Sequence, residues 1–171
     1  MSWLEGILLW GGIGAYLLGF CAYLIGLIFR KEVGIAAGWW LGMGGFILES
    51  ATVVARWVAT GHSPVVGRYE NALAGTWFIL LAFFILGRWL PGTRALGVVV
   101  MPTVLLMLGY GIMSGPELQP LPPPWQSNWL AVHVVFAWLA YGAFFLVSGL
   151  GALYLVKRRT EAKSGASAFL R

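Results

Sequence analysis

Charged side chains are scarce in this sequence. Only 10% of its 171 residues are charged, aspartate is absent, and all six acidic residues are glutamates. An ordinary soluble domain has roughly 25% charged residues. Water cannot solvate a surface with so few charges, so most of that surface must face lipid or other protein. The composition therefore excludes a soluble domain and, with 60% hydrophobic residues, predicts an integral membrane protein.

Cysteine is nearly missing, and so is a positively charged N-terminal segment. Cys21 is the single cysteine, which excludes an intrachain disulfide, and no Cys-x-x-Cys or Cys/His cluster indicates zinc. We interpret Cys21 as a small packing residue. The sequence starts MSWLEG, with an acid where a signal peptide is positive, and no A-x-A-like site follows. We therefore expect the first apolar run to be kept as a helix.

Five apolar runs are long enough to cross a bilayer, which takes about 20 residues in a helix. Their approximate bounds are 6–29, 34–58, 70–90, 95–114 and 128–156. Backbone groups in lipid must find partners within the protein, so helices are the expected form. The sequence predicts an all-α, polytopic membrane bundle over residues 1–157, followed by a cytoplasmic tail at 158–171, in which residues 160–171 look disordered.

The net charge of +5 is concentrated at the ends of these runs. Nine Lys and Arg residues lie at one set of ends, and only Arg56 and Arg68 lie at the opposite set. Cytoplasmic loops of membrane proteins carry the excess of Lys and Arg. We therefore expect the N-terminus outside and the C-terminus in the cytoplasm. This distribution points to membrane lipid as the partner and argues against nucleic acid.

This topology places two loops outside, at about 59–69 and 115–127. The second loop contains five of the eight prolines, which favours extended polyproline II structure. Trp125 and Trp129 lie around its end. Both suit the membrane interface, where amphipathic rings anchor the end of a helix.

The two histidines, His62 and His133, are predicted to lie near the same outer face. His62 falls in the first outer loop, and His133 about one turn into the last helix. Imidazole is a common protein ligand of haem iron, and an ionisable residue in a membrane segment is a functional candidate by default. A structural role remains open for each, with His133 bonding another group of the bundle and His62 solvated in its loop.

Three glutamate and arginine residues are further candidates for a polar or structural site. Glu49 lies about nine residues, or roughly 13 Å, before the outer end of the second helix. Arg56 follows seven residues later on the same face. The two could form a polar clamp between helices, or they could take part in proton transfer or ligand binding. Glu70 opens the third helix, where the helix dipole favours a carboxylate, and it is near His62 in sequence.

Two strings of residues in these outer segments carry a family resemblance. The first is Arg56-Trp57, Gly61-His62-x-Pro64, Tyr69-Glu70-Asn71 and Trp77, and the second is Pro124-x-Gln126-Ser127-Asn128-Trp129-Leu130-x-x-His133-Val134 with Ala140-Tyr141. Together they resemble the CcsA/ResC family of cytochrome c synthase components, in spacing and order, over about residues 50–145. The second string is the more specific of the two.

Members of this family carry haem to the outer membrane face and support its attachment to Cys-x-x-Cys-His apocytochromes. The resemblance implies haem as cofactor, apocytochrome c as a partner, and His133 as one of two outer-face haem ligands. We group His62, Trp125 and Trp129 with it as candidate cofactor-binding residues, and assign no catalytic residue. The implied location is a bacterial cytoplasmic membrane, with a plastid thylakoid membrane as the second choice.

The chain departs from the family pattern in one large respect. The Trp-rich WGxxWxWD segment, the later helices and the second outer histidine are absent from the sequence. We therefore do not expect a complete synthase from this chain alone. One hypothesis is a haem-handling subunit whose partner supplies the Trp-rich segment. The alternative is an accessory subunit of a larger respiratory or photosynthetic complex, and a haem-b electron-transfer or quinone site is a third reading.

Overall fold

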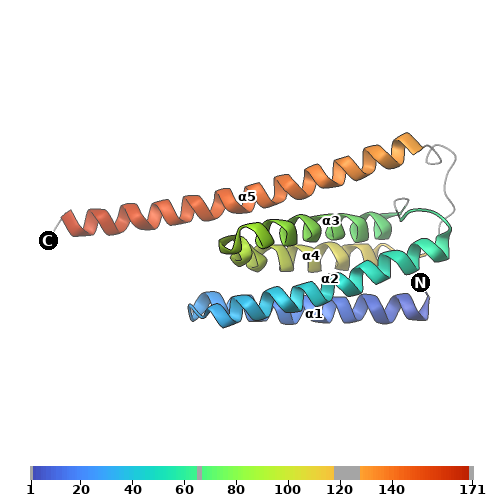
Figure 1. Cartoon of the computed structure of the whole chain (residues 1–171), viewed down its shortest axis with the longest axis horizontal. Helices are drawn as coiled ribbons and strands as arrows, with labels where there is room; N and C mark the ends of the chain where they lie inside the picture. Colours follow the sequence, from blue (N-terminus) through green and yellow to red (C-terminus); the bar gives the residue numbers. More distant parts are fainter. Residues whose placement is uncertain (1, 65–66, 118–127, 170–171) are drawn as a thin grey trace.

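The computed structural model describes residues 2–64, 67–117 and 128–169, and these residues form helices without a strand (Figure 1). The elements in chain order are α1 (Trp3–Ile28), α2 (Glu32–Thr60), α3 (Arg68–Trp89), the 3₁₀-helix η1 (Pro91–Leu96), α4 (Gly97–Met113) and α5 (Asn128–Phe169). The expected fold class, an all-α polytopic membrane bundle, is confirmed.

Four segments of the described chain are long and apolar enough to cross a membrane. They are Trp3–Ile28, Arg68–Trp89, Pro91–Met113 and Val132–Leu155. The remaining long helix, α2, has 29 residues and includes the buried Glu49 and Arg56, which lower its mean hydropathy. Passage of α2 through the membrane, and with it the count of five spans, stays a prediction from length and connectivity.

Consecutive long helices run in opposite directions (Figure 1). The start of α1, the α2–α3 connection and the end of α4 lie at one end of the bundle, and the α1–α2 turn and η1 lie at the other. This alternation places Arg68 at the first end and Arg88 at the second, as the charge pattern requires. The first end is called the outer end below, although the orientation in the membrane remains a prediction.

Glycines bring α1 and α2 into direct backbone contact. A Cβ added at Gly34 would lie 2.5 Å from the Gly26 Cα, and one at Gly19 would lie 3.3 Å from the Gly38 carbonyl oxygen. Small residues allow membrane helices to approach this closely. The Gly38-x-x-x-Gly42 pair in α2 also faces inward, with the Tyr23 ring against Gly38. The pair therefore serves packing inside the bundle.

The last helix, α5, differs from the others in length and burial. Its 42 residues would extend about 63 Å at 1.5 Å per residue, and it runs past the expected end at 156 to Phe169. Residues 158–169 continue the helix, and they contain no proline to end it. The contact with α3 is made on one side, where Trp138 covers Gly75 and Gly142 approaches Phe78.

Candidate functional site

A buried ion network ties the outer ends of three helices together. Arg56 of α2 donates from Nε to Glu70 of α3 at 3.0 Å, and its Nη1 lies 3.5 Å from Oε1 of Glu5 in α1. All three side chains are at most 1% exposed. An unpaired charge in such a place is very costly, so each of these groups depends on the other two.

Arg56 also fixes the chain that leaves α4. Its Nη1 donates to the carbonyl of Pro116 at 2.8 Å and its Nη2 to that of Glu117 at 2.7 Å. Its guanidinium lies 5.0 Å from the centre of the Tyr69 ring, and the Tyr69 hydroxyl donates to Glu5 at 3.0 Å. One arginine therefore joins α1, α2, α3 and the start of the connection to α5.

Glu49 and Arg56 do not pair with each other in the described structure, and each instead joins neighbouring helices through its own partners. Glu49 is 1% exposed and accepts instead from the Tyr16 hydroxyl of α1 and the Thr76 hydroxyl of α3, each at 2.5 Å. Seven residues of helix separate Glu49 from Arg56 by about 10 Å along the axis, while these partners come from neighbouring helices at the same depth. The protein has two separate polar clusters, one at the outer end and one deeper.

Glu5, Tyr16, Tyr69 and Thr76 were not predicted as members of a polar cluster. A signal was present in the first helix, where Glu5, Gly12, Tyr16 and Gly19 recur every three to seven residues and all lie buried on one side. Polar and small residues repeated on one face of an apolar helix mark the side that packs on other helices. Glu70, a predicted polar or structural residue at the start of the third helix, is a buried partner of Arg56.

His62 follows Gly61, the residue that caps the C-terminal end of α2. The Gly61 φ of 73° is left-handed and suits glycine, which has no Cβ. The His62 ring is half-buried, and its Nδ1 lies 2.9 Å from the Ser63 carbonyl oxygen. Because a carbonyl only accepts, this contact selects the tautomer with the proton on Nδ1. Metal-bound histidines usually have such a contact.

His133 lies in the second turn of α5 and is exposed. Trp129, one turn earlier on the same face, is 82% exposed. His133 and Gly142 are nine residues apart, which places them on opposite sides of a helix with 3.6 residues per turn. Since Gly142 marks the side in contact with α3, His133 faces away from the bundle. Trp125 lies outside the described residues.

An apolar groove of about 770 Å³ opens between α2, α3 and α5. It is lined by Ser50, Val53, Val54, Trp57, Ser63, Pro64, Ala74, Trp77, Phe78, Val132, Val135 and Phe136. Ser50, one of its few polar residues, accepts from the Trp77 indole at 2.9 Å. We call this the haem-side groove.

Neither histidine lines the haem-side groove, but each adjoins residues that do. His62 directly precedes the lining residues Ser63 and Pro64, and His133 directly follows Val132. Successive residues are about 100° apart on a helix, so His133 lies on the rim rather than in the floor. No group of three His, Cys, Asp or Glu side chains in the described chain could hold a bare metal ion.

The bundle therefore defines a polytopic helical membrane protein with a buried ion network and two histidines at one end. The profile of the cytochrome C assembly protein family matches residues 65–170. The chain belongs to this family, which confirms the resemblance found in the sequence.

The curated relatives include proteins of cyanobacteria and algae named cytochrome c biogenesis protein CcsA. The protein of Guillardia theta is 30% identical over 155 residues, which cover 86% of this chain and 50% of the relative. That of Synechococcus sp. (strain JA-2-3B'a(2-13)) is 32% identical over 129 residues, 71% of this chain and 37% of the relative. That of Chlorella vulgaris is 35% identical over 108 residues, which cover 61% of this chain and 34% of the relative.

The chain spans about half the length of these relatives or less. No solved structure matches it.

Proposed function

We propose that this chain is a haem-handling subunit in c-type cytochrome biogenesis. In this role it presents haem at the outer membrane face together with a partner subunit, and apocytochrome c receives the haem. The observation that carries the proposal is one apolar groove whose lining residues Ser63 and Val132 adjoin His62 and His133 in the sequence. The family and the names of the relatives agree with it.

The haem-side groove fits the requirements of a porphyrin. Ligand sites are apolar clefts of roughly 300–1,000 Å³ with a few placed polar groups, and this groove has about 770 Å³. The aromatic side chains of Trp57, Trp77, Phe78 and Phe136 line it. They supply flat apolar surface for the macrocycle. Haem bound there would supply the iron and the vinyl groups for thioether formation.

The histidines would serve as axial ligands in different ways. The Nδ1 contact of His62 with the Ser63 carbonyl leaves the lone pair of the neutral ring on Nε2, which is the nitrogen that iron takes in this tautomer. His133 lies on the rim and faces away from the bundle. Haem bound to it would therefore be covered partly by this chain and partly by a neighbour.

A partner subunit is part of this proposal. Most residues of α5 whose burial the structure describes are exposed, which leaves this helix a surface for a neighbour. We propose that a second polypeptide with a Trp-rich segment packs against the His133 side of α5. A bacterial cytoplasmic membrane is the proposed location, and a thylakoid membrane the second choice.

A groove-filling variant tests this proposal. Val54 lines the haem-side groove and is 60% exposed, and Val58, one turn further along α2, is 79% exposed and is not among the lining residues. Val54→Trp should lower the Soret absorbance of the purified complex per chain, while Val58→Trp should leave it unchanged. Haem absent from the wild-type chain, both alone and with its native partners, would refute haem handling.

The second candidate is an accessory subunit of a larger respiratory or photosynthetic membrane complex. It is favoured by the ion network, because Arg56, Glu5 and Glu70 are all engaged in holding helices together. A scaffold of this kind needs no haem. Stoichiometric co-purification with an electron-transfer complex, with no haem on this chain, would support it.

A further inference from the structure

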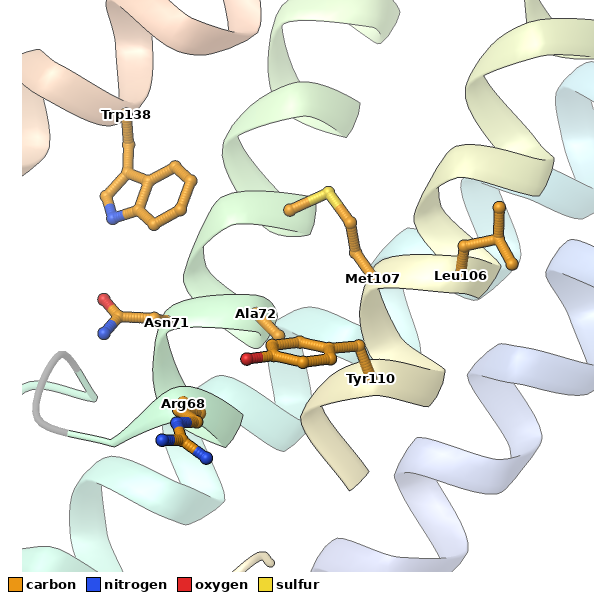
Figure 2. Close-up of a pocket in the computed structure, with 7 residues that line it drawn as sticks. All are labelled: Arg68, Asn71, Ala72, Leu106, Met107, Tyr110 and Trp138. Carbon is orange, nitrogen blue, oxygen red and sulfur yellow. The ribbon is translucent and has the colours of Figure 1, made fainter. Parts of the chain in front are cut away.

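A second groove lies on the other side of α5, between α3, α4 and α5 (Figure 2). It has a volume of about 380 Å³ and is lined by Arg68, Asn71, Ala72, Leu106, Met107, Tyr110 and Trp138. None of these residues lines the haem-side groove. We call it the Arg68 groove.

The lining changes from polar to apolar with depth. Arg68 is the first residue of α3, and Asn71 lies three residues further in. Tyr110 lies three residues from the end of α4, which is at the same end of the bundle (Figure 1). Met107 lies about one helical turn deeper than Tyr110. The groove therefore has hydrogen-bonding groups at the membrane surface and apolar ones below.

Figure 2 shows how these side chains lie. The Tyr110 ring extends from α4 across the gap toward α3, and Met107 extends the same way one turn above it in the view. The Trp138 indole comes from α5 and lies above Asn71 in the view. Its nitrogen and the Asn71 amide both lie toward the left of the view. Side chains from three helices thus surround one space.

Arg68 provides an uncompensated positive charge at this place. It is exposed, and no described carboxylate lies within ion-pair distance of it. The other arginine of the outer end, Arg56, is 1% exposed and paired with Glu5 and Glu70. Arg68 is therefore the exposed Lys or Arg side chain at this end of the described chain. Arginine in particular suits phosphate, because its planar fork can donate two hydrogen bonds to it.

We propose that the Arg68 groove binds an anionic phospholipid of the outer leaflet. The phosphate accepts hydrogen bonds from Arg68, with Asn71 and Tyr110 as further donors. One acyl chain runs down the groove past Leu106 and Met107 toward Trp138. In that leaflet a lipid has its headgroup at the membrane surface and its acyl chains below. The positive charge of Arg68 at the surface and the apolar lining below it match this orientation. This site fills the gap between α5 and the bundle, on the side away from the haem-side groove.

The test measures lipid retained by the purified full chain in mixed micelles. The micelles contain phosphatidylglycerol and phosphatidylcholine with identical acyl chains, and native mass spectrometry counts the bound lipid. Wild type should retain one phosphatidylglycerol in clear preference to phosphatidylcholine. Both lipids offer a phosphate, but only phosphatidylglycerol has a net negative charge. Arg68→Gln should therefore lower the preference for phosphatidylglycerol about tenfold, because the positive charge that favours an anionic lipid is lost.

Arg88→Gln is the matched control, because Arg88 is an exposed arginine at the other end of the same helix. It should leave the preference unchanged. Leu106→Trp, at a lining position that is 75% exposed, should fill the apolar part and lower retention of both lipids. Equal retention of the two lipids by wild type, or equal loss in Arg68→Gln and Arg88→Gln, would overturn the proposal. Haem absorbance should not change in Arg68→Gln, so this site and the haem proposal can fail separately.

Discussion

Arg56 and Glu70 form a buried pair with 3.0 Å between the Arg56 Nε and the Glu70 Oε1. The same guanidinium bonds the carbonyls of Pro116 and Glu117. The network thus extends from the α1–α2–α3 bundle to the chain that leads into α5, the helix that carries His133. Any change at Arg56 should therefore affect both the stability of the bundle and the placement of the chain at Pro116 and Glu117.

Replacement of Arg56 should destabilise the protein strongly. Arg56→Gln leaves Glu5 and Glu70 buried without their cation, and removal of one partner of a buried pair costs about 3–5 kcal/mol. The yield and the thermal aggregation midpoint in detergent should both fall. Arg88→Gln, which removes an exposed arginine, should change neither. Adding Glu70→Gln to Arg56→Gln should restore part of the loss, and a further drop in the double variant would contradict the network.

The two polar clusters should act independently. Glu49 and Arg56 have different partners, so the losses from Glu49→Gln and Arg56→Gln should add to within about 0.5 kcal/mol. Tyr16→Phe and Glu49→Gln should not add, because both break the same hydrogen bond. Double-variant cycles of thermal stability measure both cases. Strong coupling between Glu49 and Arg56 would show a contact that the structure lacks.

The orientation in the membrane can be tested by cysteine labelling. In a Cys21→Ser background, Ser63→Cys at the α2–α3 end should react with a membrane-impermeant maleimide added outside. Thr93→Cys in η1, at the opposite end of the bundle, should react only after the membrane is opened. Both positions are half-buried, so they are matched in exposure. Labelling of Thr93→Cys alone from outside would reverse the predicted topology.

His133→Gly should weaken haem retention, and added imidazole should partly restore the Soret band. Imidazole can enter the vacated place and supply the missing nitrogen, whereas a structural histidine would give no spectroscopic rescue. His62→Gly is the comparison. An equal loss would indicate that both axial ligands come from this chain, and a small loss would indicate a ligand from the partner. Unchanged absorbance in both variants would remove the histidines from the haem site.

The sequence by itself determined the helical membrane class and the family. Apolar runs of about 20 residues leave a chain in lipid no other form than helices, and this information is local. The motifs around His62 and His133 marked the family, whose profile covers residues 65–170. The alternation of the helices then placed both histidines at the same end, because His62 follows the end of α2 and His133 lies near the start of α5, and these two helix ends lie at one end of the bundle (Figure 1).

Only the tertiary structure decided which polar groups meet. Arg56 is paired with Glu5 and Glu70 rather than with Glu49, because partners depend on how each helix is rotated and which helix lies beside it. The two grooves on either side of α5 have the same origin. Each groove is lined by residues of three helices. The periodicity of a single segment does not specify the angle at which two helices pack. The exposed face of His133 likewise became visible once Gly142 showed which side of α5 packs on α3.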